Sequence, residues 1–132
     1  MERIPENRFT INARLPSLND YIEACRTHWS KGARLKAETE ELIFWAIRSA
    51  QGRGECKPAK RPVIVFFTWH ERNKRRDLDN IYSAKKYILD AMQKAGIIAN
   101  DNQKHVVGLH DTFVLSVTKN DFVEVDIMEV DE

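Results

Sequence analysis

The segment from residue 72 to residue 103 gathers residue types that could carry out phosphoryl chemistry. It begins with a basic cluster made of Arg72, Lys74, Arg75 and Arg76. Asp77 and Asp79 follow at once, and a third carboxylate, Asp101, stands further along in an Asn-Asp-Asn sequence. Cationic side chains attract phosphates, and carboxylate oxygens are the ligands that Mg²⁺ prefers. The combination predicts an enzyme that cuts a nucleic-acid backbone.

The spacing of the acids supports a shared metal ion. If the backbone is extended through residues 77–79, the side chains of Asp77 and Asp79 point to the same side. Magnesium takes only one or two protein carboxylates, together with waters and substrate phosphate. Asp101 would then close the site from the opposite side.

A helix expected from about residue 79 to Gly96 carries a lysine on its polar face. At 100° per residue, Lys86 and Asp90 both fall within about 20° of Asp79. The opposite side is apolar and predicts a core contact; it holds Ile81, Ala84, Ile88, Ala91, Met92 and Ala95. Lys85 points elsewhere, so Lys86 is the preferred active-site lysine and Lys85 the alternative.

Each of these features also has a purely structural interpretation. Asp79 could cap a helix, and Lys86 with Asp90 could form a surface pair at i, i+4. The basic cluster could be a solvated loop, and Asp101 could be a turn residue. The order and spacing of the features together favour the catalytic interpretation.

Composition sets the outer limits on fold and partners. The 132 residues predict one domain spanning residues 1–132, long enough to bury a core without disulfides. A net charge of +1 means that bulk charge gives no argument for a nucleic-acid partner, so the basic cluster alone carries it. Cys25 and Cys56 have no CxxC spacing, which argues against a zinc site. No secretory signal or membrane span is visible, and we expect a cytoplasmic protein.

Hydrophobic periodicity predicts an α+β fold of α/β-like character. The element order is β-α-β-α-β(-β), with a small mixed sheet backed by two main helices. The apolar run at 63–69 predicts a central strand buried on both faces. The remaining elements are a strand at 9–13, helices at 36–51 and 79–96, one or two strands at 105–117, and a strand at 122–130.

With those residues placed, the chain resembles the RusA family of Holliday-junction resolvases, which prophages often carry. The family pattern is a basic run, Asp-x-Asp-Asn, a helix with a lysine, Asp-Ala-Leu, an Ala-Gly turn and Asp-Asp-x-Gln. In this chain the pattern reads Arg75-Arg76-Asp77-Leu78-Asp79-Asn80, Lys86, Asp90-Ala91-Met92, Ala95-Gly96 and Asn100-Asp101-Asn102-Gln103. The sequence Pro16-Ser17-Leu18-Asn19 also resembles the loop before the family's first helix.

The resemblance implies a homodimer that binds four-way DNA junctions and cuts two strands symmetrically. The cofactor would be Mg²⁺, with Mn²⁺ able to replace it. By position, Asp77, Asp79 and Asp101 match the family's metal-binding aspartates, and Lys86 matches its catalytic lysine. Two departures are visible: Asn100 replaces the first of the family's paired acids, and the spacing from Asp79 to Asp90 is longer.

Three other function classes compete with a junction resolvase. The first is a non-catalytic DNA-binding protein, and the second is a metal nuclease for other branched or duplex DNA. The third is a transition-metal protein, but the four histidines form no HxxxH or HExxH motif; they are His28, His70, His105 and His110. Among the tryptophans, Trp45 and Trp69 are expected in the core, and Trp29 is expected to face DNA or a second subunit.

Overall fold

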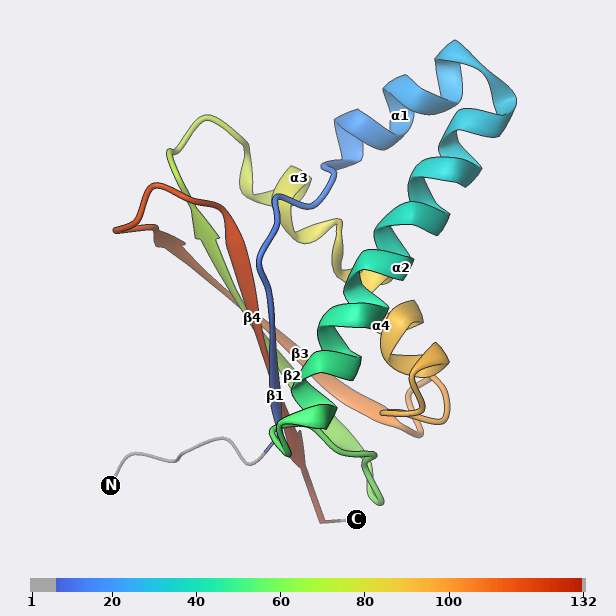
Figure 1. Ribbon diagram of the computed structural model, residues 1–132, viewed down its shortest axis with the longest axis vertical. Helices are drawn as coiled ribbons and strands as arrows, with labels where there is room; N and C mark the ends of the chain where they lie inside the picture. The colour runs from blue at the N-terminus through green and yellow to red at the C-terminus, as the bar shows by residue number, and fades with distance from the viewer. Residues whose placement is uncertain (1–6, 132) are drawn as a thin grey trace.

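The computed structural model describes residues 7–131, which form four strands and four helices (Figure 1). The α+β class expected from the sequence is therefore confirmed. In chain order the elements are β1 (Arg8–Ile11), α1 (Leu18–Thr27), α2 (Trp29–Gly52), β2 (Val63–Glu71), α3 (Leu78–Tyr82), α4 (Lys85–Lys94), β3 (Val106–Leu115) and β4 (Phe122–Glu129).

The strands form one mixed sheet in the order β1-β4-β2-β3. β4 pairs antiparallel with both β1 and β2, while β2 and β3 run parallel. Phe67 of β2 lies opposite Val125 of β4 and Asp111 of β3. A parallel pair cannot be joined by a tight turn, so α3 and α4 form the crossover between β2 and β3.

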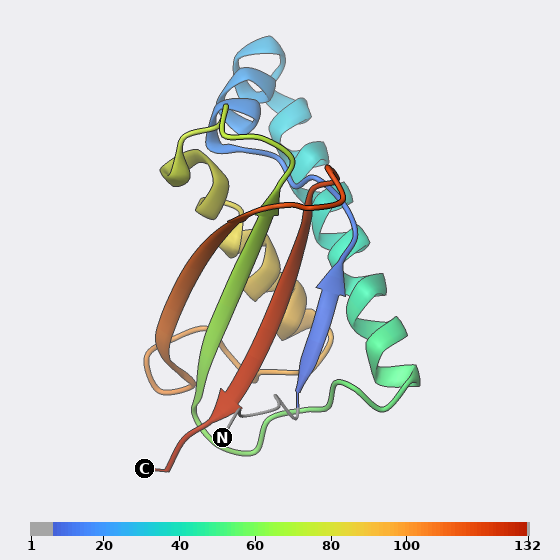
Figure 2. The same cartoon turned by 90° about the vertical axis from the view of Figure 1, so that its left-hand side faces the viewer.

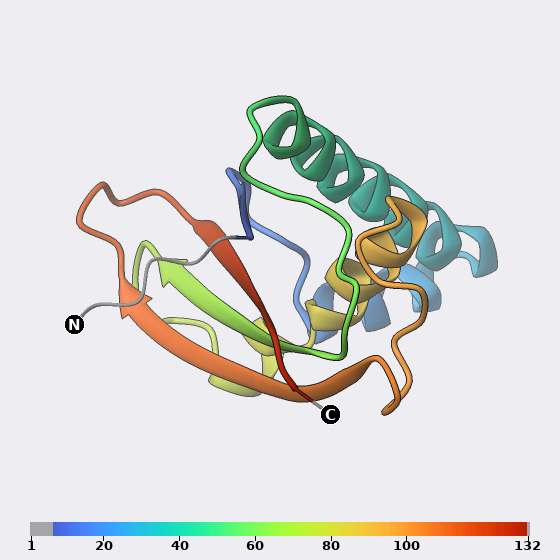
Figure 3. The same ribbon diagram turned by 90° about the horizontal axis from the view of Figure 1, so that it is seen from below.

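The sheet is covered on one face only, as Figure 3 shows from below. β2 is central, as expected, but the prediction that it is buried on both faces is wrong. Its residues alternate between buried and half-buried, because the helices cover only the face that carries Val63, Val65, Phe67 and Trp69. The other face, seen in Figure 2, carries two stacked ring pairs, Phe66 with His110 and His70 with Phe122.

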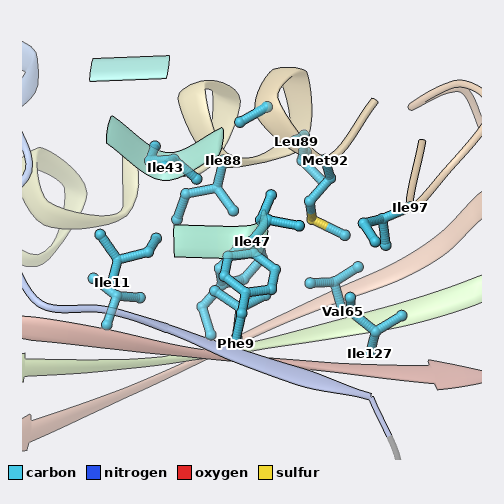
Figure 4. Packing of buried hydrophobic residues seen from close by; sticks show 14 of the residues in the cluster. Phe9, Ile11, Ile43, Ile47, Val65, Ile88, Leu89, Met92, Ile97 and Ile127 are labelled. Carbon is cyan, nitrogen blue, oxygen red and sulfur yellow. The ribbon is translucent and has the colours of Figure 1, made fainter. Parts of the chain in front are cut away.

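The core lies between the sheet and helices α2 and α4 (Figure 4). Ile43 and Ile47 come from α2, and Ile88 and Met92 come from α4; all four are fully buried. They meet the inward residues of the strands, which are Phe9, Ile11, Val65, Val125 and Ile127 among others. This packing fixes α4, and with it Lys86, against the sheet.

The first helical region is longer than predicted and is divided in two. Ser17 begins α1 with a capping box, in which its hydroxyl accepts from Asp20 N–H and the Asp20 carboxylate accepts from Ser17 N–H. His28 ends α1 and caps α2, its Nδ1 accepting from Ser30 N–H at 3.2 Å. The predicted start at residue 36 is therefore wrong, because the apolar periodicity begins only after the polar first turns of α2.

The second helical region is broken where the sequence predicted a continuous helix. α3 ends at Tyr82 and α4 begins at Lys85. At the break, the Ser83 hydroxyl donates to the Asn80 carbonyl at 2.8 Å, which competes with the regular helical bonding. Gly96 ends the region with a positive φ of 77°, as a residue after a helix commonly does.

Candidate active site

The loop after β2 holds the basic cluster, and one of its arginines is built into the structure. Arg76 donates to both carboxylate oxygens of Glu71, from Nε at 3.0 Å and from Nη2 at 2.8 Å. Its Nη1 donates to the Leu15 carbonyl at 3.0 Å. Both side chains of the ion pair are only 13% exposed. Arg76 therefore closes the loop onto the end of β2 and ties it to the segment before α1.

The other basic residues of the cluster differ in their freedom. Arg72 lies 3.6 Å from the carboxylate of Asp121, which also accepts from the Arg72 backbone N–H. Lys74 and Arg75 are exposed, and their side chains have no partner among residues 7–131. Of the four predicted DNA contacts, Lys74 and Arg75 are thus the most available to a phosphate.

The paired aspartates lie at the start of α3. Asp77 occupies the N-cap position with an extended backbone, φ −68° and ψ 148°, but its carboxylate makes no capping bond. Asp79 lies in the first turn of the helix. Both are exposed, and neither carboxylate has a partner in the part of the chain that the structure describes. A cavity of about 340 Å³ lies beside Asp77 and includes Lys74 in its lining.

Lys86 lies between two carboxylates. Its Nζ donates to Asp101 Oδ2 at 2.6 Å and lies 3.1 Å from Asp90 Oδ1. The hydrogen bond to Asp101, followed by that to Asp90, raises the pKa of Lys86 above the ordinary lysine value. In return, the Lys86 ammonium lowers the pKa of Asp101. At neutral pH the lysine is therefore protonated and Asp101 is ionised.

Lys85 belongs to a different cluster, which the sequence did not reveal. Its Nζ donates to Asp111 Oδ2 at 2.6 Å, while Trp69 Nε1 donates to Asp111 Oδ1 at 2.8 Å. The ammonium also lies 4.6 Å from the centre of the Tyr82 ring. Lys85 is 19% exposed, against 64% for Lys86. The more exposed Lys86 is therefore the better placed of the two to meet a substrate.

The predicted convergence of Asp77, Asp79 and Asp101 is not seen among the residues that the structure describes. Among residues 7–131, no three His, Cys, Asp or Glu side chains lie close enough together to hold a metal ion. The break between α3 and α4 also removes the continuous helix on which the shared face of Asp79 and Lys86 was predicted. Asp77 and Asp79 still supply free carboxylates of the kind that Mg²⁺ accepts in pairs, whereas Asp101 is engaged by Lys86.

The histidines are dispersed. His70 Nε2 lies 2.5 Å from Glu124 Oε1, and His105 Nδ1 lies 2.8 Å from Asn102 Oδ1. His28 caps α2, and His110 stacks on Phe66. Their separate partners give no support to a histidine metal centre.

No protein-family model and no curated protein sequence matches the chain. None of the helices within residues 7–131 is long and apolar enough to cross a membrane.

Proposed function

We propose that this protein is a magnesium-dependent endodeoxyribonuclease that resolves four-way DNA junctions. The observation that carries the proposal is the protonated Lys86, held between Asp101 and Asp90 on an exposed surface. Asp77 and Asp79, unpaired and exposed, supply the acids, and Lys74 and Arg75 supply free positive charge.

In the proposed mechanism, Asp77 and Asp79 would hold the ion, and Asp101, which the structure pairs with Lys86, would be the third candidate ligand. A bound Mg²⁺ would supply Lewis acidity at the scissile phosphate and would lower the pKa of a bound water. Lys74 and Arg75 bind the DNA backbone, a contact that positions the strand without reading its sequence.

Lys86 acts on the phosphate. An ammonium group has three N–H donors, and the two neighbouring carboxylates engage two of them. The third can donate to a phosphate oxygen, where negative charge grows as the nucleophile attacks. Asp90 and Asp101 fix the direction of the donor, so the ammonium group need not reorganise during the reaction.

The proposed partner is branched DNA, and the proposed assembly is a homodimer. A four-way junction has approximate two-fold symmetry, and paired cuts are most simply made by a C2 dimer with one site in each subunit.

The test compares a labelled four-way junction with a matched duplex, each with and without magnesium. The wild type should cut the junction only when magnesium is present. Asp79→Asn should abolish cleavage while junction binding survives, because the change removes a ligand charge and keeps the shape. Glu38→Gln, at an exposed acid on α2, is the matched control and should cut normally.

Three results would contradict the proposal. Wild-type cleavage by Asp79→Asn would remove the metal assignment. Junction binding without magnesium-dependent cleavage would indicate a non-catalytic DNA-binding protein. Equal cutting of the duplex would indicate a metal nuclease with a different substrate.

A further inference from the structure

Trp29 is the most exposed tryptophan of the chain, at 84% of its surface. It is the first residue of α2, and its ring stacks on that of His28 with the centroids 5.7 Å apart. α1 and the first turns of α2 form an arm that extends beyond the sheet (Figure 1). A large flat ring at the corner of this arm is free to receive a planar ligand.

The arm is a firm support for that ring. α1 and α2 approach closely at Gly32, where an added Cβ would lie 2.3 Å from Cys25 Sγ. The arm is also attached to the candidate site, because Asn19 N–H donates to Asn80 Oδ1 at 3.2 Å. Asn80 directly follows Asp79, so the arm and the acid pair are held in a fixed relation.

A groove lies between α2 and α4, and its lining includes Asp90, one of the two carboxylate partners of Lys86. It has a volume of about 460 Å³, and its lining consists of Ala33, Lys36, Ala37 and Glu40 from α2 and Asp90, Gln93 and Lys94 from α4. Trp29 precedes Ala33 by four residues and Lys36 by seven, which places all three on one side of α2. The indole therefore lies on the helix side that forms the groove.

Ion pairs across the groove set the relative height of the two helices. Lys36 lies 3.9 Å from Asp90, and Lys94 lies 2.5 Å from Glu40. From Lys36 to Glu40 in α2 the partner changes from Asp90 to Lys94 in α4, so the two helices run in the same direction. Trp29 lies four residues before Ala33, or about 6 Å along the axis, and so lies beyond the lined part of the groove toward the N-terminal end of α2.

Exposed cations lie at the same end of the arm as Trp29. Arg26 is in the last turn of α1, and Lys31 and Arg34 are in the first turns of α2, where helix geometry turns them about 160° and 140° from Trp29. Within residues 7–131, none of the three has an acidic partner. Proteins bind single-stranded nucleic acid with an exposed aromatic ring, which stacks on a base, and with nearby cations, which bind the phosphates.

We propose that Trp29 stacks on a base whose face is exposed at the branch point of the DNA, with Arg26 binding an adjoining phosphate and with Lys31 and Arg34 adding positive charge on the other side of α2. The inference rests on the proposed function and adds the part of the substrate that the arm recognises. Inside a continuous duplex both faces of each base are covered by neighbouring base pairs, whereas stacking is interrupted at a branch point, so this contact favours branched over linear DNA.

The test measures binding by fluorescence anisotropy in EDTA, so that no cleavage occurs. The probes are a four-way junction, a single-stranded oligo-dT and a matched duplex. Trp29→Ala should weaken binding of oligo-dT and junction by roughly tenfold, within the range found for loss of one base stack, and should leave duplex binding unchanged. Trp29→Phe keeps a ring and should retain most of the affinity, while Trp29→Leu should not.

Trp45→Ala is the matched control. Trp45 is 60% exposed, so the expectation that it lies in the core is wrong. It lies sixteen residues along the same helix, which turns it about 160° away from Trp29. This variant should bind all three probes like the wild type. In addition, 2-aminopurine placed at the branch point should be quenched by the wild type and by Trp29→Phe, but not by Trp29→Ala.

The outcomes separate the two proposals. If Trp29→Ala binds oligo-dT and junction as tightly as the wild type, the stacking role is wrong, and magnesium-dependent cleavage still stands. If the variant weakens duplex and single strand equally, stacking is also wrong, because the loss is then general. If the wild type binds none of the probes, both proposals fail. Should Trp29→Ala not fold, equal affinities of Trp29→Phe and Trp29→Leu for oligo-dT would overturn the inference.

Discussion

Replacing Arg76 with alanine should destabilise the fold far more than replacing its neighbour Arg75. The change removes two charge-assisted hydrogen bonds to Glu71 and one to the Leu15 carbonyl. Glu71, whose side chain is 13% exposed in the intact protein, then has no cation beside it. Breaking a buried pair in this way costs about 3–5 kcal/mol, and the remaining exposure places Arg76→Ala at the lower end, about 3 kcal/mol. Arg75→Ala removes an exposed side chain and should change stability by less than about 0.5 kcal/mol.

Urea unfolding followed by circular dichroism and tryptophan fluorescence would measure both variants. A loss of about 3 kcal/mol corresponds to a midpoint lower by about 1–3 M urea at the slopes usual for small domains. Arg76→Lys should recover only part of the loss, because an ammonium cannot form the two-pronged contact with the carboxylate. An unfolding midpoint of Arg76→Ala within error of that of Arg75→Ala would refute the structural role of Arg76.

Three further predictions follow from the site and the core. Replacing both Lys74 and Arg75 with alanine should reduce the slope of log affinity against log salt concentration by about 2, because each phosphate contact contributes about 0.9 to that slope. An unchanged slope in gel-shift measurements would show that neither side chain contacts the DNA. Lys86→Met should raise the pKa of Asp101 toward its ordinary value, which ¹³C NMR of the carboxyl group would detect. The lowered pKa of Asp101 stabilises the fold above the ordinary carboxylate pKa, and this stabilisation is lost on acidification. The free energy of unfolding of Lys86→Met should therefore fall less than that of the wild type between neutral and acid pH. Equal falls would contradict the pairing of Lys86 with Asp101. Burial raises the pKa of the Cys56 thiol to about 11, so Ellman's reagent at pH 8 should label one thiol per native chain and both in urea; two rapid thiols in the native protein would show that Cys56 is accessible.

The sequence predicted those helices and strands whose residue pattern can be recognised within the segment itself. The alternation of Val123, Val125 and Ile127 reported a strand with one buried face, and these residues are buried in β4. The run at 63–69 predicted the central strand, but continuous apolarity could not show that one face lacks a helix. Ile64 and Phe66 are only half-buried there, because strand composition does not report which face another element covers.

The candidate site was predictable in its residue types but not in its pairings. The i, i+4 relation of Lys86 and Asp90 follows from helix geometry, and the structure shows that contact. The bond from Lys86 to Asp101 depends on where the loop after α4 returns, which no local pattern reports. Asp111 was missed for a similar reason: its position opposite Phe67 becomes visible only with the register of β2 and β3.

The break at Ser83 shows a further limit. Residues 79–96 have the periodicity of one amphipathic helix, and a 100° step carries angular positions across the whole segment. Two turn residues between α3 and α4 reset that angle. A wheel drawn through the break therefore compares side chains on separate helices.

The candidate residues from Arg72 to Asp101 all lie on the single connection between β2 and β3. Two neighbouring strands that run the same way require such a detour, so this stretch is demanded by the topology itself. Its length is only loosely constrained, because lengthening a chain segment between fixed ends adds little entropic cost. Insertions here would shift the distance along the chain between the acids and leave the four strands paired as before. For this architecture, the place of a residue between two particular strands identifies its role better than the count of residues separating it from the next acid.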